Sequence, residues 1–390
     1  MLGKTGLTTT ESTNQLMYST RLHSMDALRG CLMLLGILVH IALCHALFWG
    51  KFWILQDSYQ NIIFDVFILI IRSFRMELFF FMSGFFVNLM LETKGHYYFI
   101  KNRIVKILIP FIVCEQIMLI IMPLAVPQQV LNNDINYFRP FHLWFLYYLM
   151  LIYINIYVFK IIIKIFFWQQ NKQQKLKKTI EVIFTKLMAS KAHILILASI
   201  TFLSLTAMQS IVIDTPIGFS IQYRLLIHYG IFFYFGWMTR QNPKVFTSII
   251  NNRTIYLLIA IANIIFLTIS FLKFNINYSH SNNIIFLLHF LIFRGSYACC
   301  TWCLVFGMIG FFQYYLNKEN KLLRYLSASS YWLYIIHLPI ICFLEKNNLY
   351  NNIALGCFKP IIIFFVSLFV LLISYHAIIR YNYLKYFLNS

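Results

Sequence analysis

The stretch MDALRGCLMLLGILVHIAL, residues 25 to 43, decides the fold class of this chain. Its apolar side chains continue for long enough to cross the hydrocarbon core of a bilayer, which takes about 20 residues in a helix. The stretch also carries Asp26 and Arg29 at its start and His40 deep inside. Ionisable groups at membrane depth are costly and by default indicate function. We therefore expect a transmembrane helix with one functional face.

The composition of the whole chain agrees with a membrane protein. Of the 390 residues, 60% are hydrophobic and 11% are charged, whereas soluble proteins carry roughly 25% charged residues. The net charge of +20 does not indicate nucleic-acid binding, because the lysines lie in short loops between apolar runs. Such loops are typical of the cytoplasmic side of a membrane protein. We expect the lipid bilayer as a partner and no nucleic acid.

Apolar runs of sufficient length predict an all-α, polytopic fold with about ten transmembrane helices. We expect a flexible cytoplasmic N-terminus over 1–24, a transmembrane domain over 25–380 and a cytoplasmic tail over 381–390. The expected spans are 29–49, 66–91, 104–123, 143–163, 192–213, 222–239, 254–272, 284–316, 328–345 and 354–379.

The distribution of Lys and Arg predicts the orientation. With both termini in the cytoplasm, nine of the 32 basic residues fall in external loops or inside spans, which leaves 23 on the cytoplasmic side. This asymmetry follows the positive-inside rule. The nine are Lys51, Arg72, Arg75, Arg139, Arg224, Lys273, Arg294, Lys346 and Lys359.

Arg29 and His40 share one face of the first helix. Eleven residues make just over three turns, so the two side chains leave the same side, about 16 Å apart along the axis. A ligand with phosphates at one end and a reactive group at the other fits this spacing, and acyl-coenzyme A is such a ligand. Arginine suits its phosphates, and histidine is well suited to take a proton from a hydroxyl near neutral pH.

Several blocks of this sequence resemble the membrane-bound acyltransferase-3 family. They are DALRG with Arg29 and His40 eleven residues apart, FRMELFFFMSGFF (74–86), FIKNRIVKILIPF (99–111), HLWFLYYLMLIY (142–153) and LSASSYWLYIIHLPI (326–340). They occur in the family's order over roughly 25–345. The resemblance is nearest to the glucan biosynthesis protein C-like branch, which is associated with succinylation of periplasmic glucans. The chain departs from that pattern at Glu77, where proline is usual, and at Lys106, where arginine is usual.

The resemblance implies roles for individual residues. His40 would be the essential residue, either as general base or as a transiently acylated relay, with Arg29 as its partner in donor binding. Asp26 is the third candidate for the catalytic group, although capping of the first helix is an equal alternative. Arg103 and Lys106 would contact the donor phosphates.

Other ionisable residues have more than one interpretation. Arg72 and Arg75 either hold an anionic acyl group or form a buried ion pair with Glu77. On the acceptor side, His337, His142 and Glu77 are candidates, and packing is an equal alternative for the two histidines.

These observations predict an integral membrane O-acyltransferase of the inner (plasma) membrane. It would move an acetyl or succinyl group from acyl-coenzyme A to a hydroxyl of a glycan or other envelope carbohydrate. We expect acyl-coenzyme A as a donor substrate, no permanently bound cofactor and no metal. The alternative is a transporter or flippase of a glycan or small anionic solute, in which the buried charges line a permeation path.

Overall fold

The computed structural model describes residues 22–126, 140–166, 170–216, 218–277, 284–346, 356 and 358–388, and all regular elements within them are helical. Most of the predicted N-terminal tail and Arg139 lie outside the described residues. The elements are α2 (His23–His45), η1 (Trp49–Phe52), α3 (Ile62–Arg72), α4 (Arg75–Arg103), η2 (Ile104–Leu108), α5 (Ile109–Ala125), η3 (Phe141–Leu143), α7 (Trp144–Phe166), α8 (Gln170–Ala189), α9 (His193–Thr206), α10 (Tyr223–Gln241), α11 (Pro243–Asn251), α12 (Arg253–Asn277), α13 (Ile284–Tyr315), α14 (Lys321–Lys346), α15 (Phe358–Ser374), η6 (Tyr375–Ile379) and α16 (Lys385–Leu388).

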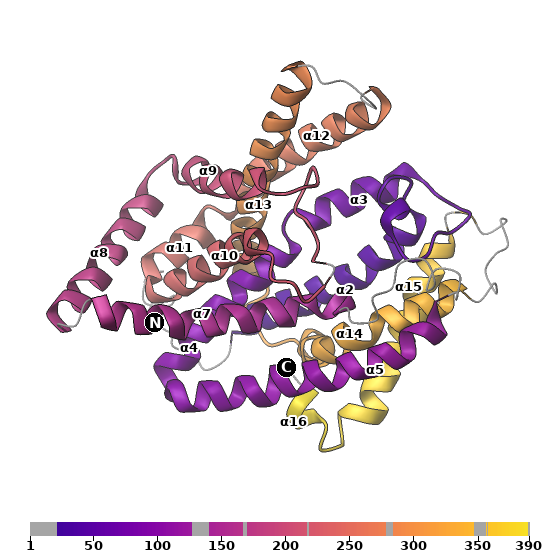
Figure 1. Ribbon diagram of the computed structural model, residues 1–390, viewed down its shortest axis with the longest axis horizontal. Helices are drawn as coiled ribbons and strands as arrows, with labels where there is room; N and C mark the ends of the chain where they lie inside the picture. Colours follow the sequence, from indigo (N-terminus) through magenta and orange to yellow (C-terminus); the bar gives the residue numbers. More distant parts are fainter. Residues whose placement is uncertain are drawn as a thin grey trace, which may run out of the picture.

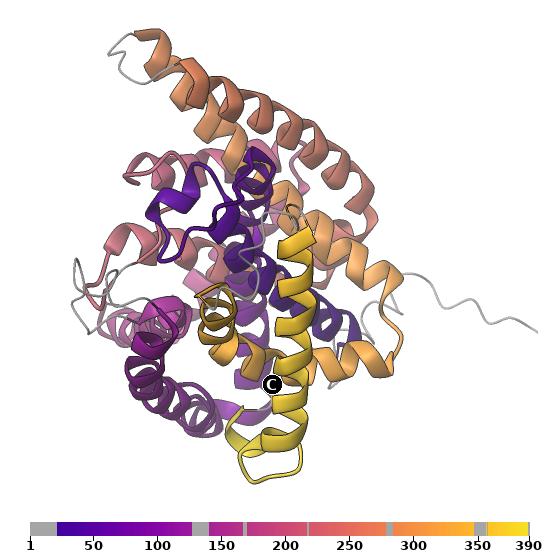
Figure 2. The same ribbon diagram turned by 90° about the vertical axis from the view of Figure 1, so that its right-hand side faces the viewer.

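The helices pack around α2 and α4, which lie at the centre of the bundle (Figure 1). Helix α4 packs against α10, and α2 packs against α14. Helices α12 and α13 run side by side as a hairpin that extends beyond the others in both views (Figures 1 and 2). Helix α15 covers α14 and α2 on another side.

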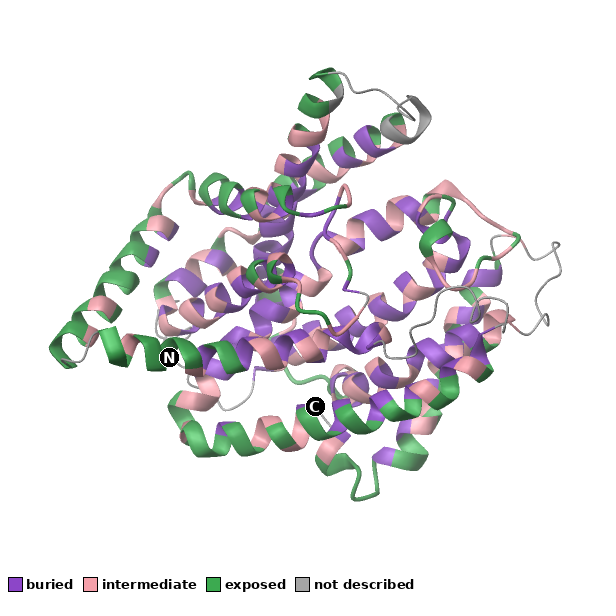
Figure 3. Cartoon of the chain, viewed as in Figure 1, coloured by how far each residue is buried: buried purple, intermediate pink, exposed green. Residues whose placement is uncertain are grey.

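The outer surface of the bundle is apolar. Large side chains on the outward faces are exposed, for example Ile120 (69%), Leu203 (68%) and Phe369 (66%). Figure 3 shows these outward faces on several helices, with the buried residues gathered at the centre. In water such surfaces would be unfavourable over this extent, whereas in a bilayer they face lipid chains. The protein is therefore a multi-pass membrane protein.

The described part of the chain holds seven helical runs that are long and apolar enough to cross a membrane, or eight if the bent pair α8–α9 forms one span. One run, Ile62–Ala125, includes the predicted spans 66–91 and 104–123 and is kinked at Gly95. Ten spans and cytoplasmic termini remain predictions.

The fifth predicted span is wrong in its extent. Helix α9 ends at Thr206 after 14 residues, about 21 Å at 1.5 Å per residue, and the residues from 207 to 222 that the structure describes are not helical. The segment contains Asp214, Pro216 and Gly218, residue types that interrupt helices. Residues of this segment, among them Gln209, Ser210 and Asp214, line the cavity described below.

Helices α4 and α10 approach each other very closely through two glycines. A Cβ atom added to Gly84 would lie 1.8 Å from the backbone oxygen of Phe233, and one added to Gly236 would lie 2.0 Å from that of Phe81. No side chain fits at either position. The crossing fixes α4, and α4 forms one wall of the candidate site.

Candidate active site

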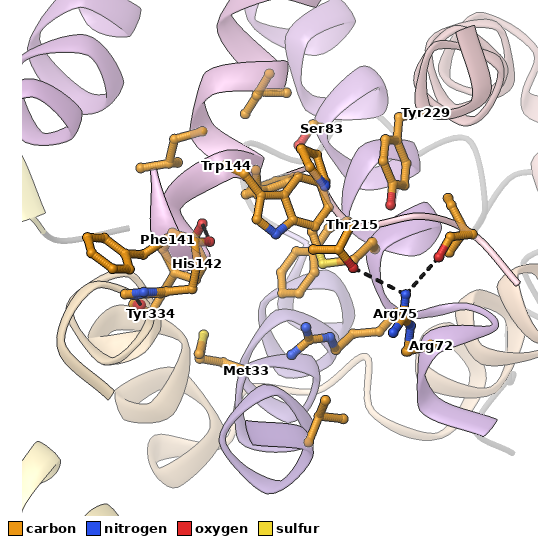
Figure 4. A pocket seen from close by; sticks show the side chains of 18 of the residues that line it. Met33, Arg72, Arg75, Ser83, Phe141, His142, Trp144, Thr215, Tyr229 and Tyr334 are labelled. Carbon is orange, nitrogen blue, oxygen red and sulfur yellow. Dashed lines mark hydrogen bonds between the residues drawn. The ribbon is translucent and has the colours of Figure 1, made fainter. Parts of the chain in front are cut away.

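A cavity of about 2090 Å³ lies between α2, α4, α7, α14, η2 and the segment 209–216. Figure 4 shows part of its lining. Pockets for drug-sized ligands measure about 300–1,000 Å³, so this volume has room for two ligands at once. Its lining includes exposed residues at opposite ends, Lys94 and Tyr98 on α4 and Lys51 and Phe52 on η1.

Helix α2 presents one face to this cavity. Arg29, Met33 and His40 all line it, as their spacing on a helix requires. Gly36 lies on the same face, and the guanidinium of Arg75 occupies the space where a side chain would be. A Cβ atom at Gly36 would lie only 2.4 Å from Nη1 of Arg75.

Helix α4 forms the opposite wall. Its lining residues include a series three or four positions apart, which is the period of one helix face: Arg75, Phe79, Met82, Phe86, Met90 and Lys94. The Phe86 ring lies 5.5 Å from the guanidinium carbon of Arg29, so the two walls meet here. Ser83 is the serine of the Ser-Gly-Phe block, and it faces the cavity beside the close crossing at Gly84.

One end of the cavity is cationic. Arg29, Lys94, Arg103 and Lys106 line it, and the positive charges of the other three act on Lys106. Aromatic rings hold Arg103, whose guanidinium carbon lies 5.4 Å from the ring of Phe99 and 5.7 Å from that of Tyr153. Cations gathered in a cleft attract anions, so this end suits a polyanion such as a phosphate group.

Three histidines meet deeper in the cavity. The ring centroid of His40 lies 5.0 Å from that of His337 and 6.4 Å from that of His142, and the last two are 4.8 Å apart. All three line the cavity. They come from α2, η3 and α14. The sequence predicted all three as site residues but did not predict that their rings lie this close together.

Arg72 and Arg75 have different environments. Arg72 donates from Nη2 to the backbone oxygen of Ile213 (2.7 Å) and to Oγ1 of Thr215 (3.2 Å). Figure 4 shows these bonds, with Arg75 pointing away from them into the pocket. Within the described ranges, Arg75 makes no hydrogen bond or ion pair.

The predicted ion pair of Glu77 with Arg72 or Arg75 is wrong. Glu77 is fully buried, and its Oε1 lies 3.4 Å from Nε2 of His228 on α10. The reason is helical geometry, because Glu77 leaves α4 on the side facing α10. Glu77 is not among the residues that line the cavity, so this position gives no support to an acceptor-side role.

Asp26 does not cap the first helix. Helix α2 starts at His23, with Leu22 as its cap residue, which puts Asp26 in the first turn. Its Oδ1 lies 3.8 Å from Nη1 of Arg29 and accepts a bond from Oγ of Ser327 at 3.3 Å. Asp26 therefore connects Arg29 to α14. It does not itself line the cavity.

Described residues of the segment from 207 to 222 line the end of the cavity near Arg72, and this part of the site was not predicted from the sequence. Arg72 and Arg294 donate to its backbone oxygens. Burial raises the pKa of Asp214, but N–H groups of Gln209 and Ser210, each at 2.9 Å, outweigh burial and lower that pKa below its usual value. The turn residues Asp214 and Pro216 were the available signal.

No group of three His, Cys, Asp or Glu side chains in the described ranges has the arrangement of a metal site. A comparison with protein families finds a match to the acyltransferase domain of the acyltransferase-3 family over residues 22–379. No curated protein and no solved structure matches the chain.

Proposed function

The chain belongs to the acyltransferase-3 family, and we propose that it transfers an acyl group from acyl-coenzyme A to a hydroxyl of a glycan or other envelope carbohydrate. It is a membrane acyltransferase. The donor, the acceptor and the inner (plasma) membrane as its location belong to the proposal. By the positive-inside rule we expect the cationic end of the cavity to face the cytosol, where acyl-coenzyme A is available.

The observation that carries the proposal is a single cavity that connects four cations to His40. Arg29 and His40 are about 16 Å apart along α2. The phosphates of coenzyme A would lie among Arg29, Arg103 and Lys106, and its extended pantetheine arm would follow the wall of α4 inward. The thioester then reaches His40, while the acceptor enters from the end near 209–216.

The reaction follows from the chemistry of His40. The imidazole takes the proton from the acceptor hydroxyl as its oxygen attacks the thioester carbonyl carbon. A carbon–oxygen bond forms, the carbon–sulfur bond breaks, and the leaving thiolate of coenzyme A takes the proton back from His40. The products are an ester and free coenzyme A. A transiently acylated His40 is the alternative course.

Of the two arginines near the acyl position, Arg75 is the one available to a ligand. Arg72 donates its hydrogen bonds to Ile213 and Thr215. The guanidinium of Arg75 instead lies against α2 at Gly36, in electrostatic range of His40. A carboxylate at the far end of a succinyl group would neutralise Arg75. This supports a succinyl donor over an acetyl donor.

The test uses membranes that contain the protein, radiolabelled acetyl- or succinyl-coenzyme A and a panel of glycan acceptors. We expect His40→Ala to lower ester formation by about 10²–10⁴-fold, the usual contribution of a general base. His376→Ala is the matched control, because His376 is exposed and does not line the cavity. Full activity of His40→Ala, inserted at the normal level, would refute the proposal.

The transporter alternative has one observation in its favour, because the cavity lining includes exposed residues at opposite ends. The same membranes decide between the two functions. Movement of labelled solute or glycan across sealed vesicles, without any ester formed, would favour the transporter.

A further inference from the structure

We propose that His337 is a positioning residue that sets the tautomer of His40, so that Nε2 of His40 is the nitrogen that takes the proton. The proposal rests on the proposed acyl transfer and extends it. Backbone carbonyl oxygens of α14 would determine which nitrogen of His337 carries the proton. His337 would in turn determine which nitrogen of His40 carries the proton.

The first step is the tautomer of His337. Its Nδ1 lies 3.0 Å from the backbone oxygen of Leu333 and 2.8 Å from that of Tyr334. Carbonyl oxygens only accept hydrogen bonds, so Nδ1 carries the proton and donates it. In the neutral ring, Nε2 then holds a bare lone pair. This Nε2 is buried and has no hydrogen-bond partner among the described residues.

The second step concerns which ring nitrogen of His40 faces the other two histidines and which faces the substrate. Nδ1 of His40 is buried and has no partner within the described ranges, whereas Nε2 is not among the buried orphan atoms. Since His40 lines the cavity, Nε2 is the nitrogen left to face the substrate. A base at Nε2 requires the proton on Nδ1, and a buried N–H group requires an acceptor.

The nearest suitable acceptor is His337. An in-line N–H···N bond of about 2.9 Å between two imidazoles separates their ring centroids by about 5 Å, and the centroids of His40 and His337 are 5.0 Å apart. A hydrogen bond from Nδ1 of His40 to Nε2 of His337 is compatible with this separation. His142 is further away, at 6.4 Å. The ring centroid of Trp53 lies 5.2 Å from that of His40, but an indole N–H group only donates hydrogen bonds, so Trp53 offers Nδ1 no acceptor.

Backbone carbonyl oxygens also set the tautomer of His142, but there Nε2 carries the proton, whereas in His337 it is Nδ1. Its Nε2 donates to the backbone oxygens of Tyr334 (2.8 Å) and Ile335 (2.9 Å), and its Nδ1 is a buried atom without a partner. The two histidines that surround His40 are thus both preset as acceptors.

The arrangement corresponds to a catalytic triad in which a neutral imidazole stands in the place of the orienting carboxylate. It differs from a direct acceptor contact, the role predicted for His337 from the sequence. Loss of an orienting group lowers turnover, whereas loss of a contact to the acceptor changes its KM as well.

The experiment compares His337→Leu with His337→Gln in the full-length protein. Glutamine places an acceptor oxygen close to the position of Nε2, whereas leucine has none. We expect His337→Leu to lose roughly 10–100-fold in kcat, less than a complete loss of the base, with KM for donor and acceptor unchanged. His337→Gln should recover most of that loss. Equal activity of the two variants, or a loss confined to KM, would overturn the proposal.

A second measurement does not depend on activity. Nitrogen-15 spectra of histidine-labelled protein, with His40 assigned by its absence in His40→Ala, report which ring nitrogen carries the proton. We expect protonated Nδ1 and bare Nε2 at His40. The opposite tautomer would overturn the inference even if acyl transfer is confirmed, whereas absence of acyl transfer with the expected tautomer would refute only the proposed function.

Discussion

Replacing Gly36 with alanine tests whether the position of Arg75 matters for the reaction. The added Cβ would lie 2.4 Å from Nη1 of Arg75, and ordinary contact starts at 3.4 Å, so the guanidinium must move by at least 1 Å. The obstacle is the end of a flexible side chain, so the fold should adapt. Alanine is also favoured over glycine inside a helix by up to about 1 kcal/mol.

A displacement of about 1 Å in a positioned group costs about 100-fold in rate. We therefore expect Gly36→Ala to lose about 100-fold in kcat/KM with the succinyl donor and less than tenfold with the acetyl donor. The assay is ester formation with each donor, next to a thermal unfolding curve in detergent.

Gly230→Ala on α10 is the matched control for Gly36→Ala, because a Cβ there meets nothing within 4 Å. Unchanged kcat/KM of Gly36→Ala with both donors would refute the role of Arg75. A Tm well below that of Gly230→Ala would refute the claim that the side chain of Arg75 simply moves aside.

Three further predictions concern packing, donor binding and pH. Gly84→Ala should destabilise the protein by about 1–3 kcal/mol or more, because its Cβ meets the backbone of α10 at 1.8 Å; a Tm equal to that of Gly230→Ala would contradict this. Arg103→Ala should raise the KM for acyl-coenzyme A about tenfold, leave kcat unchanged and weaken the salt dependence of KM, and a change in kcat alone would count against a phosphate contact. Asp214→Asn should cost about 1–3 kcal/mol at neutral pH. Folding lowers the pKa of Asp214. The stabilisation by its carboxylate is therefore complete above the unfolded pKa of about 3.9 and is lost as pH falls through the folded pKa. The unfolding curves of the wild-type protein and Asp214→Asn should converge in acid and not in base.

Features that depend on one helix were predictable from the sequence. The membrane class follows from composition, and the shared face of Arg29 and His40 follows from the helical period, so both line one cavity. Arg103 and Lys106, the predicted donor contacts, lie at the cationic end of the cavity on α4 and η2. These properties are local, and tertiary packing did not overturn them.

Features that depend on contacts between distant segments were not predictable. Glu77 pairs with His228 rather than with an arginine of its own neighbourhood, because the side of α4 that faces α10 is set by the glycine crossing. Lys359, which lies inside the predicted span 354–379, is buried in an ion pair with Asp57. The histidine cluster combines three segments far apart in the chain, and only the structure brings them together.

The most direct test of the central claim is a cryo-electron microscopy structure of the protein with bound coenzyme A. We predict the phosphates within hydrogen-bond distance of Arg29, Arg103 or Lys106, and the thiol sulfur beside Nε2 of His40. Coenzyme A bound outside this cavity, or with its sulfur directed away from His40, would contradict the account.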